Sequence, residues 1–169
     1  MAKIERDMLS IAGEFAVASE LGRRNIYAQP TFGHLKRTDL LILDKTGNLL
    51  RIEAKGKQGS QWPNCKGISG SNSIMVLVDY AAKGDMDRPD FYILTLDDWL
   101  AFLKGVLERF PTKGIEIDAD NCPVWTKQIK DGKPYRGCGI TVKDVAQHKE
   151  KWDKIEKLLG QNHRTRRCT

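Results

Sequence analysis

The chain has 169 residues and a mass of 19.1 kDa, the size of one domain whose core needs no disulfide or metal to hold it together. Apolar residues make up 40% and charged residues 30% of it, a composition that indicates a folded soluble protein and excludes a disordered chain. The 28 Lys and Arg residues outnumber the 22 Asp and Glu residues, and this basic balance favours an acidic or phosphate-bearing partner.

Membrane and disulfide chemistry are both excluded by the sequence pattern. The longest apolar runs, such as residues 74–78, are too short to cross a bilayer, and residues 1–7 lack the apolar stretch of a secretory signal. The cysteines are scattered without a C-x-x-C pair, which predicts free thiols: Cys65, Cys122, Cys138 and Cys168. We therefore expect a cytoplasmic protein with no membrane partner.

The first predicted elements are a helix over residues 4–21 and a short strand at residues 26–27. Apolar residues recur in the helix at spacings of three and four, which predicts one inward face: Ile4, Met8, Ile11, Phe15 and Ala18. Gly22 follows the last of them, as is typical of a helix end.

Two further strands, over residues 38–43 and 49–55, are predicted to form a hairpin. Asp44 and Gly47 fit the first and fourth positions of a type I turn, which is followed in the common three-residue hairpin by a left-handed residue. Asp44 then closes the loop opposite Asn48, so paired residue numbers add up to 92 along both strands.

The remaining elements complete a mixed sheet protein. Residues 56–73 are rich in Gly and Ser, which predicts a long mobile loop, and the apolar run at residues 73–80 predicts a central strand. A strand over residues 91–94, a helix that starts at Thr95 and a final helix over residues 141–159 follow, with weak strand signals at residues 115–117 and 124–125. The predicted class is α/β (α+β), with one domain over residues 1–169, a core at about 4–110 and an irregular and helical part at about 111–169.

The hairpin register brings Asp39 directly opposite Glu53. Directly opposite residues have their Cβ atoms roughly 4.5–5.5 Å apart, and two carboxylates held that close repel each other. A divalent cation between them removes the repulsion. Oxygen ligands open to a phosphate suit Mg²⁺ or Mn²⁺. Alternation along the strand puts Lys55 on the same face as Glu53, where an amine can orient or deprotonate a water or neutralise charge on a phosphate.

Glu14 lies at the margin of the apolar helix stripe, from where it can reach the metal directly or through water. Each acid also has an ordinary interpretation, as the start of a strand, a solvated strand face or a helix rim. The order of an acid on a helix, an Asp strand, a short turn and an E-x-K strand favours the functional interpretation over these.

Gly13-Glu14, Thr38-Asp39 and Glu53-Ala54-Lys55 together resemble the PD-(D/E)XK nuclease superfamily, in particular its Holliday-junction-resolvase-like and small uncharacterised bacterial and phage branches. The resemblance implies a restriction-endonuclease-like core, a central mixed sheet flanked by helices, that binds Mg²⁺ and hydrolyses phosphodiesters. It implies metal ligation by Asp39, Glu53 and the Ala54 carbonyl, with Lys55 as catalytic lysine and Glu14 as auxiliary acid. Thr38 replaces the Pro of the motif, and the segment after Lys55 does not have the pattern of the long helix usual there.

Polar residues on either side of the motif suit a phosphate backbone, although a solvated basic loop explains them equally well. These candidate nucleic-acid contacts are His34, Lys36, Arg37, Lys57, Gln58, Gln61 and Lys66. Trp62 is a candidate for stacking on a base.

The leading hypothesis is a Mg²⁺-dependent DNA endonuclease, acting as a homodimer where both strands are cut. A non-catalytic module that binds nucleic acid or protein is the alternative from another class, and a ribonuclease is the third. The absence of a Gly-rich phosphate loop argues against an ATPase or kinase.

Overall fold

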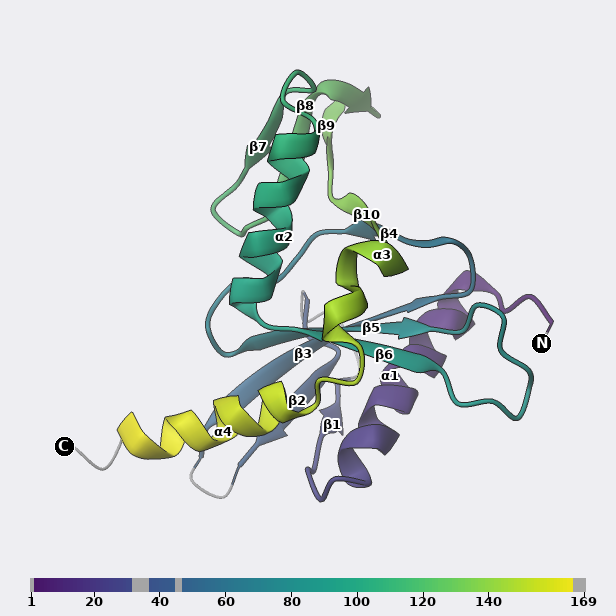
Figure 1. Ribbon diagram of the computed structural model, residues 1–169, viewed down its shortest axis with the longest axis vertical. Coiled ribbons are helices and arrows are strands. Elements are labelled where there is room, and N and C mark those ends of the chain that lie inside the picture. Colours follow the sequence, from purple (N-terminus) through teal and green to yellow (C-terminus); the bar gives the residue numbers. More distant parts are fainter. Residues whose placement is uncertain (1, 32–36, 45–46, 166–169) are drawn as a thin grey trace.

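The computed structural model describes residues 2–31, 37–44 and 47–165, without the side chains of residues 130 and 161–165. A five-stranded sheet in the order β1-β2-β3-β5-β6 forms its centre (Figure 1). Only β3 and β5 run parallel within this sheet, and its other neighbours are antiparallel, so the sheet is mixed. Its strands are β1 (Gln29–Pro30), β2 (Leu40–Leu43), β3 (Leu49–Lys57), β5 (Ser73–Asp79) and β6 (Asp90–Leu94).

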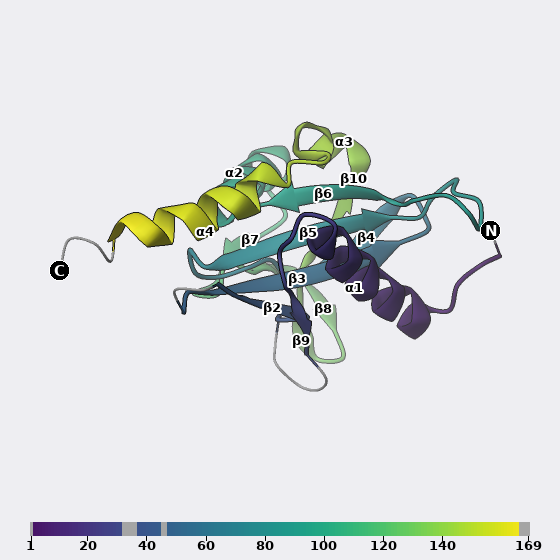
Figure 2. The ribbon, with the colours of Figure 1, turned by 90° about the horizontal axis from the view of Figure 1, so that it is seen from below.

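One face of the sheet is covered by α1 (Arg6–Gly22) and by the start of α4 (Asp153–Thr165). Figure 2 shows α1 lying across the strands. Val17 and Leu21 of α1 and Ile155 of α4 belong to the same buried cluster as Ile52 and Val76 of the sheet. Each apolar side chain fully buried in this way contributes about 1.5–3 kcal/mol.

The other face is covered by α2 (Leu96–Arg109), α3 (Val142–Val145), the single 3₁₀ turn η1 (Ala146–His148) and the strand pair β4 (Gln61–Cys65) and β10 (Cys138–Thr141). Trp62 and Trp99 join Leu77 in a second buried cluster there. A separate three-stranded sheet extends beyond it (Figure 1): β7 (Ile115–Ile117), β8 (Pro123–Lys130) and β9 (Lys133–Arg136). The protein is thus a mixed α/β fold with a central mixed sheet flanked by helices, as predicted.

The predicted hairpin is confirmed, including its register. Leu40 pairs with Ile52, and the pairing continues to Leu43 with Leu49, so every pair adds up to 92. The N–H of Gly47 donates to the Asp44 carbonyl over 3.0 Å, and Gly47 has a φ of 78°, the left-handed residue that this turn requires. The strands around residues 73–80, 91–94, 115–117 and 124–125 are also confirmed, and Thr95 caps α2 through a capping box with Asp98.

The predicted inward face of the first helix is wrong for three of its large residues, although Ala18 does pack against the core. Met8, Ile11 and Phe15 are exposed by 53%, 43% and 51%, whereas the sheet is contacted by Gly13 and Val17. Small residues turn inward because α1 packs closely on β3. A Cβ added at Gly13 would lie 3.4 Å from the backbone nitrogen of Gly56, and one added at Gly56 would lie 2.6 Å from the Leu9 carbonyl oxygen.

Three other expectations need correction, the first two because of contacts between segments far apart in sequence. Residues 56–73 are not a mobile loop, because β4 pairs with β10 and buries Trp62. The final helix is interrupted after η1, where the Glu150 N–H donates to the Phe91 carbonyl of β6 over 2.8 Å. The strand expected at residues 26–27 forms instead at Gln29–Pro30. In the described part of the chain, no helix is long and apolar enough to cross a bilayer.

Candidate active site

Asp39 and Glu53 lie side by side at the end of the β2–β3 hairpin. Asp39 directly precedes β2, and one of its carboxylate oxygens accepts a hydrogen bond of 2.7 Å from the Ala54 N–H of β3. Because the N–H and C=O of a strand residue point to the same side, the Ala54 carbonyl also faces the side of β3 on which Asp39 lies. Two carboxylates and one backbone carbonyl therefore converge where β2 begins.

Lys55 completes this arrangement from the same face of β3. Its ammonium lies 3.0 Å from one carboxylate oxygen of Glu53, and its side chain is 35% exposed while that of Glu53 is 3% exposed. Leu50, Ile52 and Ala54 point into the core on the opposite face, as the alternation predicts. The lysine is therefore the solvent-facing member of a pair whose acid is buried.

Glu14 approaches the site from α1. Its neighbour Gly13 packs on Gly56, the residue that follows Lys55. This contact places Glu14 of the helix near Lys55 of the strand. Partial burial and the negative charge of Asp39 both raise the pKa of Glu14, while the Ser10 hydroxyl and Lys55 lower it. The acid on the helix and the acid before β2 thus lie within electrostatic range of each other, as the sequence predicts.

Burial dominates the electrostatics of the group. Burial raises the pKa of Asp39 and of Glu53, although Lys55 favours the charged form of both. Burial lowers the pKa of Lys55, but the charge and hydrogen bond of Glu53, together with Asp39, more than offset it and raise the pKa overall. The site therefore concentrates negative charge around one ammonium group, with the Glu53 carboxylate buried and the Lys55 side chain partly exposed.

The donor set fits a hard divalent cation. One oxygen of Glu53, Oε2, is buried and has no hydrogen-bond partner among the described residues, which is costly unless a hydrogen-bond donor or a cation binds there. Among the described residues, no group of three His, Cys, Asp or Glu side chains is arranged to hold a metal ion. Mg²⁺ needs less than that, because it is commonly held by one or two carboxylates and completes its shell with water and substrate phosphates.

The structure corrects two of the predicted nucleic-acid contacts. Lys57 is 3% exposed, and its ammonium is bound 2.5 Å from Asp79 and lies over the Trp62 ring, so it is not available to a phosphate. Gln58 uses both ends of its amide within the protein: it accepts from the Ile4 N–H and donates to the Ala2 carbonyl, each over 2.9 Å. It holds the N-terminal segment rather than projecting into solvent.

Of the other predicted nucleic-acid contacts, one lies near the candidate active site, two are exposed and two are not described by the structure. Arg37 is near enough to Glu53 to lower its pKa, and it donates over 2.9 Å to the Asp120 carbonyl in the β7–β8 loop. Gln61 and Lys66 are exposed. His34 and Lys36 lie outside the described residues.

Trp62 cannot stack on a base. Its side chain is 1% exposed, its indole N–H donates to the Val78 carbonyl over 3.0 Å, and its ring packs edge-on against Tyr92. Trp99 and Trp152 are buried in the core. Cys65, Cys122 and Cys138 are free and buried, and burial raises the pKa of all three thiols.

Sequence reasoning missed two features that shape the site. The first is the contact between Gly13 and Gly56, for which isolated glycines within a helix and a strand were an available signal. The second is the contact of Arg37 with Asp120, which ties the site to the C-terminal part of the chain. No local pattern indicates a contact of that sequence separation.

A cleft of about 1130 Å³ lies beside Lys55. Its wall combines residues near the start of the chain (3, 4, 6, 9 and 10) with residues 55–59, 61–64, 80 and 82–84, so both Gln58 and Gln61 are in it. The cleft therefore connects the candidate active site with the beginning of the chain.

The sequence matches no family model and no curated protein. Among solved structures, the chain is similar to a bacterial homing endonuclease, I-Ssp6803I, with a TM-score of 0.49 and 13% sequence identity. The similarity covers 95% of this chain and 99% of that chain.

Proposed function

We propose that this chain is a metal-dependent DNA endonuclease of the PD-(D/E)XK type, with its active site at Asp39, Glu53 and Lys55. The observation that carries the proposal is the buried Oε2 of Glu53, which lacks a hydrogen-bond partner although the charges of Asp39 and Lys55 both act on that carboxylate. A hairpin with only a structural role gains no stability from an unpaired buried oxygen beside a second acid. In a cation site, the same oxygen is a ligand.

Asp39, Glu53 and the Ala54 carbonyl would hold the cation, which we propose to be Mg²⁺ or Mn²⁺. When bound, such a cation polarises the scissile phosphate and lowers the pKa of a coordinated water. The Ala54 N–H fixes the Asp39 carboxylate in place, so its free oxygen is oriented before substrate arrives.

Lys55 is the cationic member of the proposed site. Its ammonium can donate to a phosphate oxygen and offset the charge that develops during hydrolysis, or orient or deprotonate the attacking water. Glu14, with its own pKa raised by burial and by Asp39, adds a carboxylate at the helix side of the site. A single site cuts one strand, so cleavage of both strands would use two copies of the chain.

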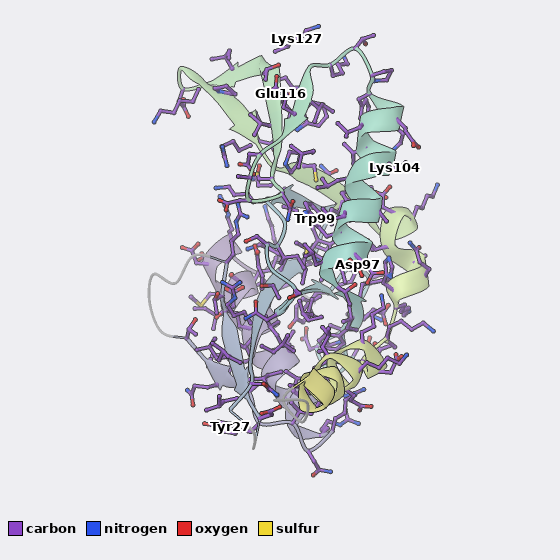
Figure 3. All side chains as sticks on the ribbon, turned by 90° about the vertical axis from the view of Figure 1, so that its left-hand side faces the viewer. Tyr27, Asp97, Trp99, Lys104, Glu116 and Lys127 are labelled. Atoms are coloured by element: carbon purple, nitrogen blue, oxygen red, sulfur yellow. The ribbon has the colours of Figure 1, made fainter. Side chains whose placement is uncertain are left out.

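The test is nicking of supercoiled plasmid by the purified protein in Mg²⁺ or Mn²⁺, with EDTA as the metal-free arm. Asp39→Asn, Glu53→Gln and Lys55→Ala are each expected to lower the nicking rate by at least a hundredfold while circular dichroism stays unchanged. Glu116→Gln is the matched control, because this Glu is exposed on β7, away from the site (Figure 3). Full activity in any of the three site variants, or nicking that survives EDTA, would refute the assignment.

A further inference from the structure

The cleft beside Lys55 has a strongly one-sided charge. Five basic residues are in its wall, and no Asp or Glu among the described residues lines it: Lys3, Arg6, Lys55, Lys57 and Lys83. A concave surface with one sign of charge concentrates ligands of the opposite sign.

Three of the five cations are already neutralised inside the protein. Lys55 pairs with Glu53, Lys57 with Asp79, and Lys83 with Asp90 at 3.2 Å. Lys3 and Arg6 differ from them, because both are exposed and no ion pair between described residues includes either of them. The uncompensated charge of the cleft therefore comes from the start of the chain.

Gln58 fixes that start against the sheet. Its amide accepts from the Ile4 N–H and donates to the Ala2 carbonyl, which are the residues on either side of Lys3. Tyr80 adds a second attachment, since its hydroxyl donates to the Ala12 carbonyl of α1 over 3.0 Å. In Figures 1 and 2 the N-terminal segment accordingly lies beside the loop between β5 and β6.

We propose that this cleft binds the sugar–phosphate backbone of the DNA strand next to the cut phosphate, with Lys3 and Arg6 as phosphate contacts and Gln58 as the residue that positions them. The inference rests on the proposed function for the position of the cut, at Lys55. At about 1130 Å³ the cleft is at the upper end of the roughly 300–1,000 Å³ of ligand pockets, which leaves room for a stretch of backbone.

Contact in this cleft is made with the backbone and not with bases. Its aromatic residues, Trp62 and Tyr80, are only 1% and 7% exposed, so neither offers a ring face for stacking. Binding there is expected to be independent of sequence and strongly dependent on salt, because each phosphate contact releases condensed counterions.

The experiment measures binding of a fluorescein-labelled DNA duplex by anisotropy between 50 and 200 mM salt, in EDTA, so that no cleavage occurs. The double variant Lys3→Ala/Arg6→Ala is expected to lower the slope of log K against log salt by about 1.8. Over this salt range the wild type then loses about tenfold more affinity than the variant does. The matched control removes two exposed lysines elsewhere, Lys104→Ala/Lys143→Ala, of which Lys104 lies on α2 (Figure 3).

Gln58→Leu tests the positioning role, because it keeps both cations but removes their attachment. It is expected to lower the slope as the double variant does, whereas Gln128→Leu, at an exposed position of β8, is expected to leave it unchanged. An unchanged slope in Gln58→Leu would overturn the positioning role.

The result separates this inference from the proposed nuclease function. A slope in Lys3→Ala/Arg6→Ala equal to that of the lysine control, or no measurable DNA binding by the wild type, overturns the cleft assignment even if plasmid is nicked. A lowered slope in a protein that does not nick plasmid supports the cleft and refutes the active site.

Discussion

A single methyl group added at Gly56 is expected to separate α1 from β3. The new Cβ would lie 2.6 Å from the Leu9 carbonyl oxygen and 3.3 Å from the Leu9 Cγ. The first distance is shorter than real Cβ contacts allow, and the obstructing atom belongs to the helix backbone, so no side-chain rotation relieves it. The helix must move away from the sheet, and Glu14 moves with it.

The size of the effect follows from that geometry. Insertion of one methyl into a packed contact costs about 1–3 kcal/mol when backbone must shift. Gly13→Ala adds the same methyl on the other side of the contact, but its Cβ would lie 3.4 Å from the nearest atom, an ordinary separation. Alanine also favours a helix interior by about 1 kcal/mol over glycine. We therefore expect Gly13→Ala to be neutral or stabilising and Gly56→Ala to be destabilising, with the two variants about 2–4 kcal/mol apart.

Urea unfolding of the two variants, followed by tryptophan fluorescence, measures the difference. Plasmid nicking at a temperature where both variants are folded then shows whether displacement of α1 also lowers activity, as the position of Glu14 predicts. Equal unfolding free energies in the two variants would refute the close packing of α1 on β3. The expected destabilisation of Gly56→Ala, together with unchanged nicking by that variant, would refute a role for Glu14.

Three further predictions concern the metal, the pH dependence of stability and the core. Mn²⁺ at about 100 times its Kd is expected to stabilise the wild type by about 2.7 kcal/mol, and a similar rise in melting temperature in Glu53→Gln would contradict ligation by that residue. Hydrogen bonds from Arg88, and also from Arg24, hold the pKa of Glu20 at about 2 against its burial, below the ordinary 4.5. The stabilisation by Glu20 is thus complete above about pH 4.5 and is lost as pH falls towards 2, so Glu20→Gln should be less stable than wild type at pH 7 by about 1–3 kcal/mol in urea unfolding, and the gap should close on acidification. Trp62→Ala is expected to cost about 3–5 kcal/mol because the residue is buried, whereas Trp62→Phe should bind DNA as the wild type does; a tenfold affinity loss in Trp62→Phe would indicate base stacking instead.

The parts of the site that were predictable from sequence depend on local geometry. The turn at Asp44 and Gly47 specifies the hairpin register, and the register places Asp39 against Glu53. Alternation along β3 then puts Lys55 beside Glu53. Each step spans only a few residues, so sequence rules for turns and strands suffice.

The parts that were not predictable depend on contacts between distant segments. A lysine at the end of a strand is ordinarily solvated, and nothing in the sequence around Lys57 indicates otherwise. Lys57 is buried because Asp79 of the neighbouring strand β5 neutralises its charge. Trp62 is buried because β4 pairs with β10, and five other strands and a helix separate these two strands in the sequence. The buried face of α1 is not predictable from periodicity, because periodicity shows only where the apolar residues lie. The close approach of the helix to Gly56 decides which face can pack against β3.

Because the hairpin register is fixed, the proposed active site depends on the number of residues between Asp39 and Glu53. One residue inserted into β2 or β3, between the turn and either acid, would reverse the orientation of every side chain beyond it and direct a carboxylate into the hydrophobic layer under α1. Length changes are therefore expected to be excluded within this segment. Substitutions there can accumulate freely at Leu43 and Leu49, both exposed, provided that the spacing from Asp39 to Glu53 is kept.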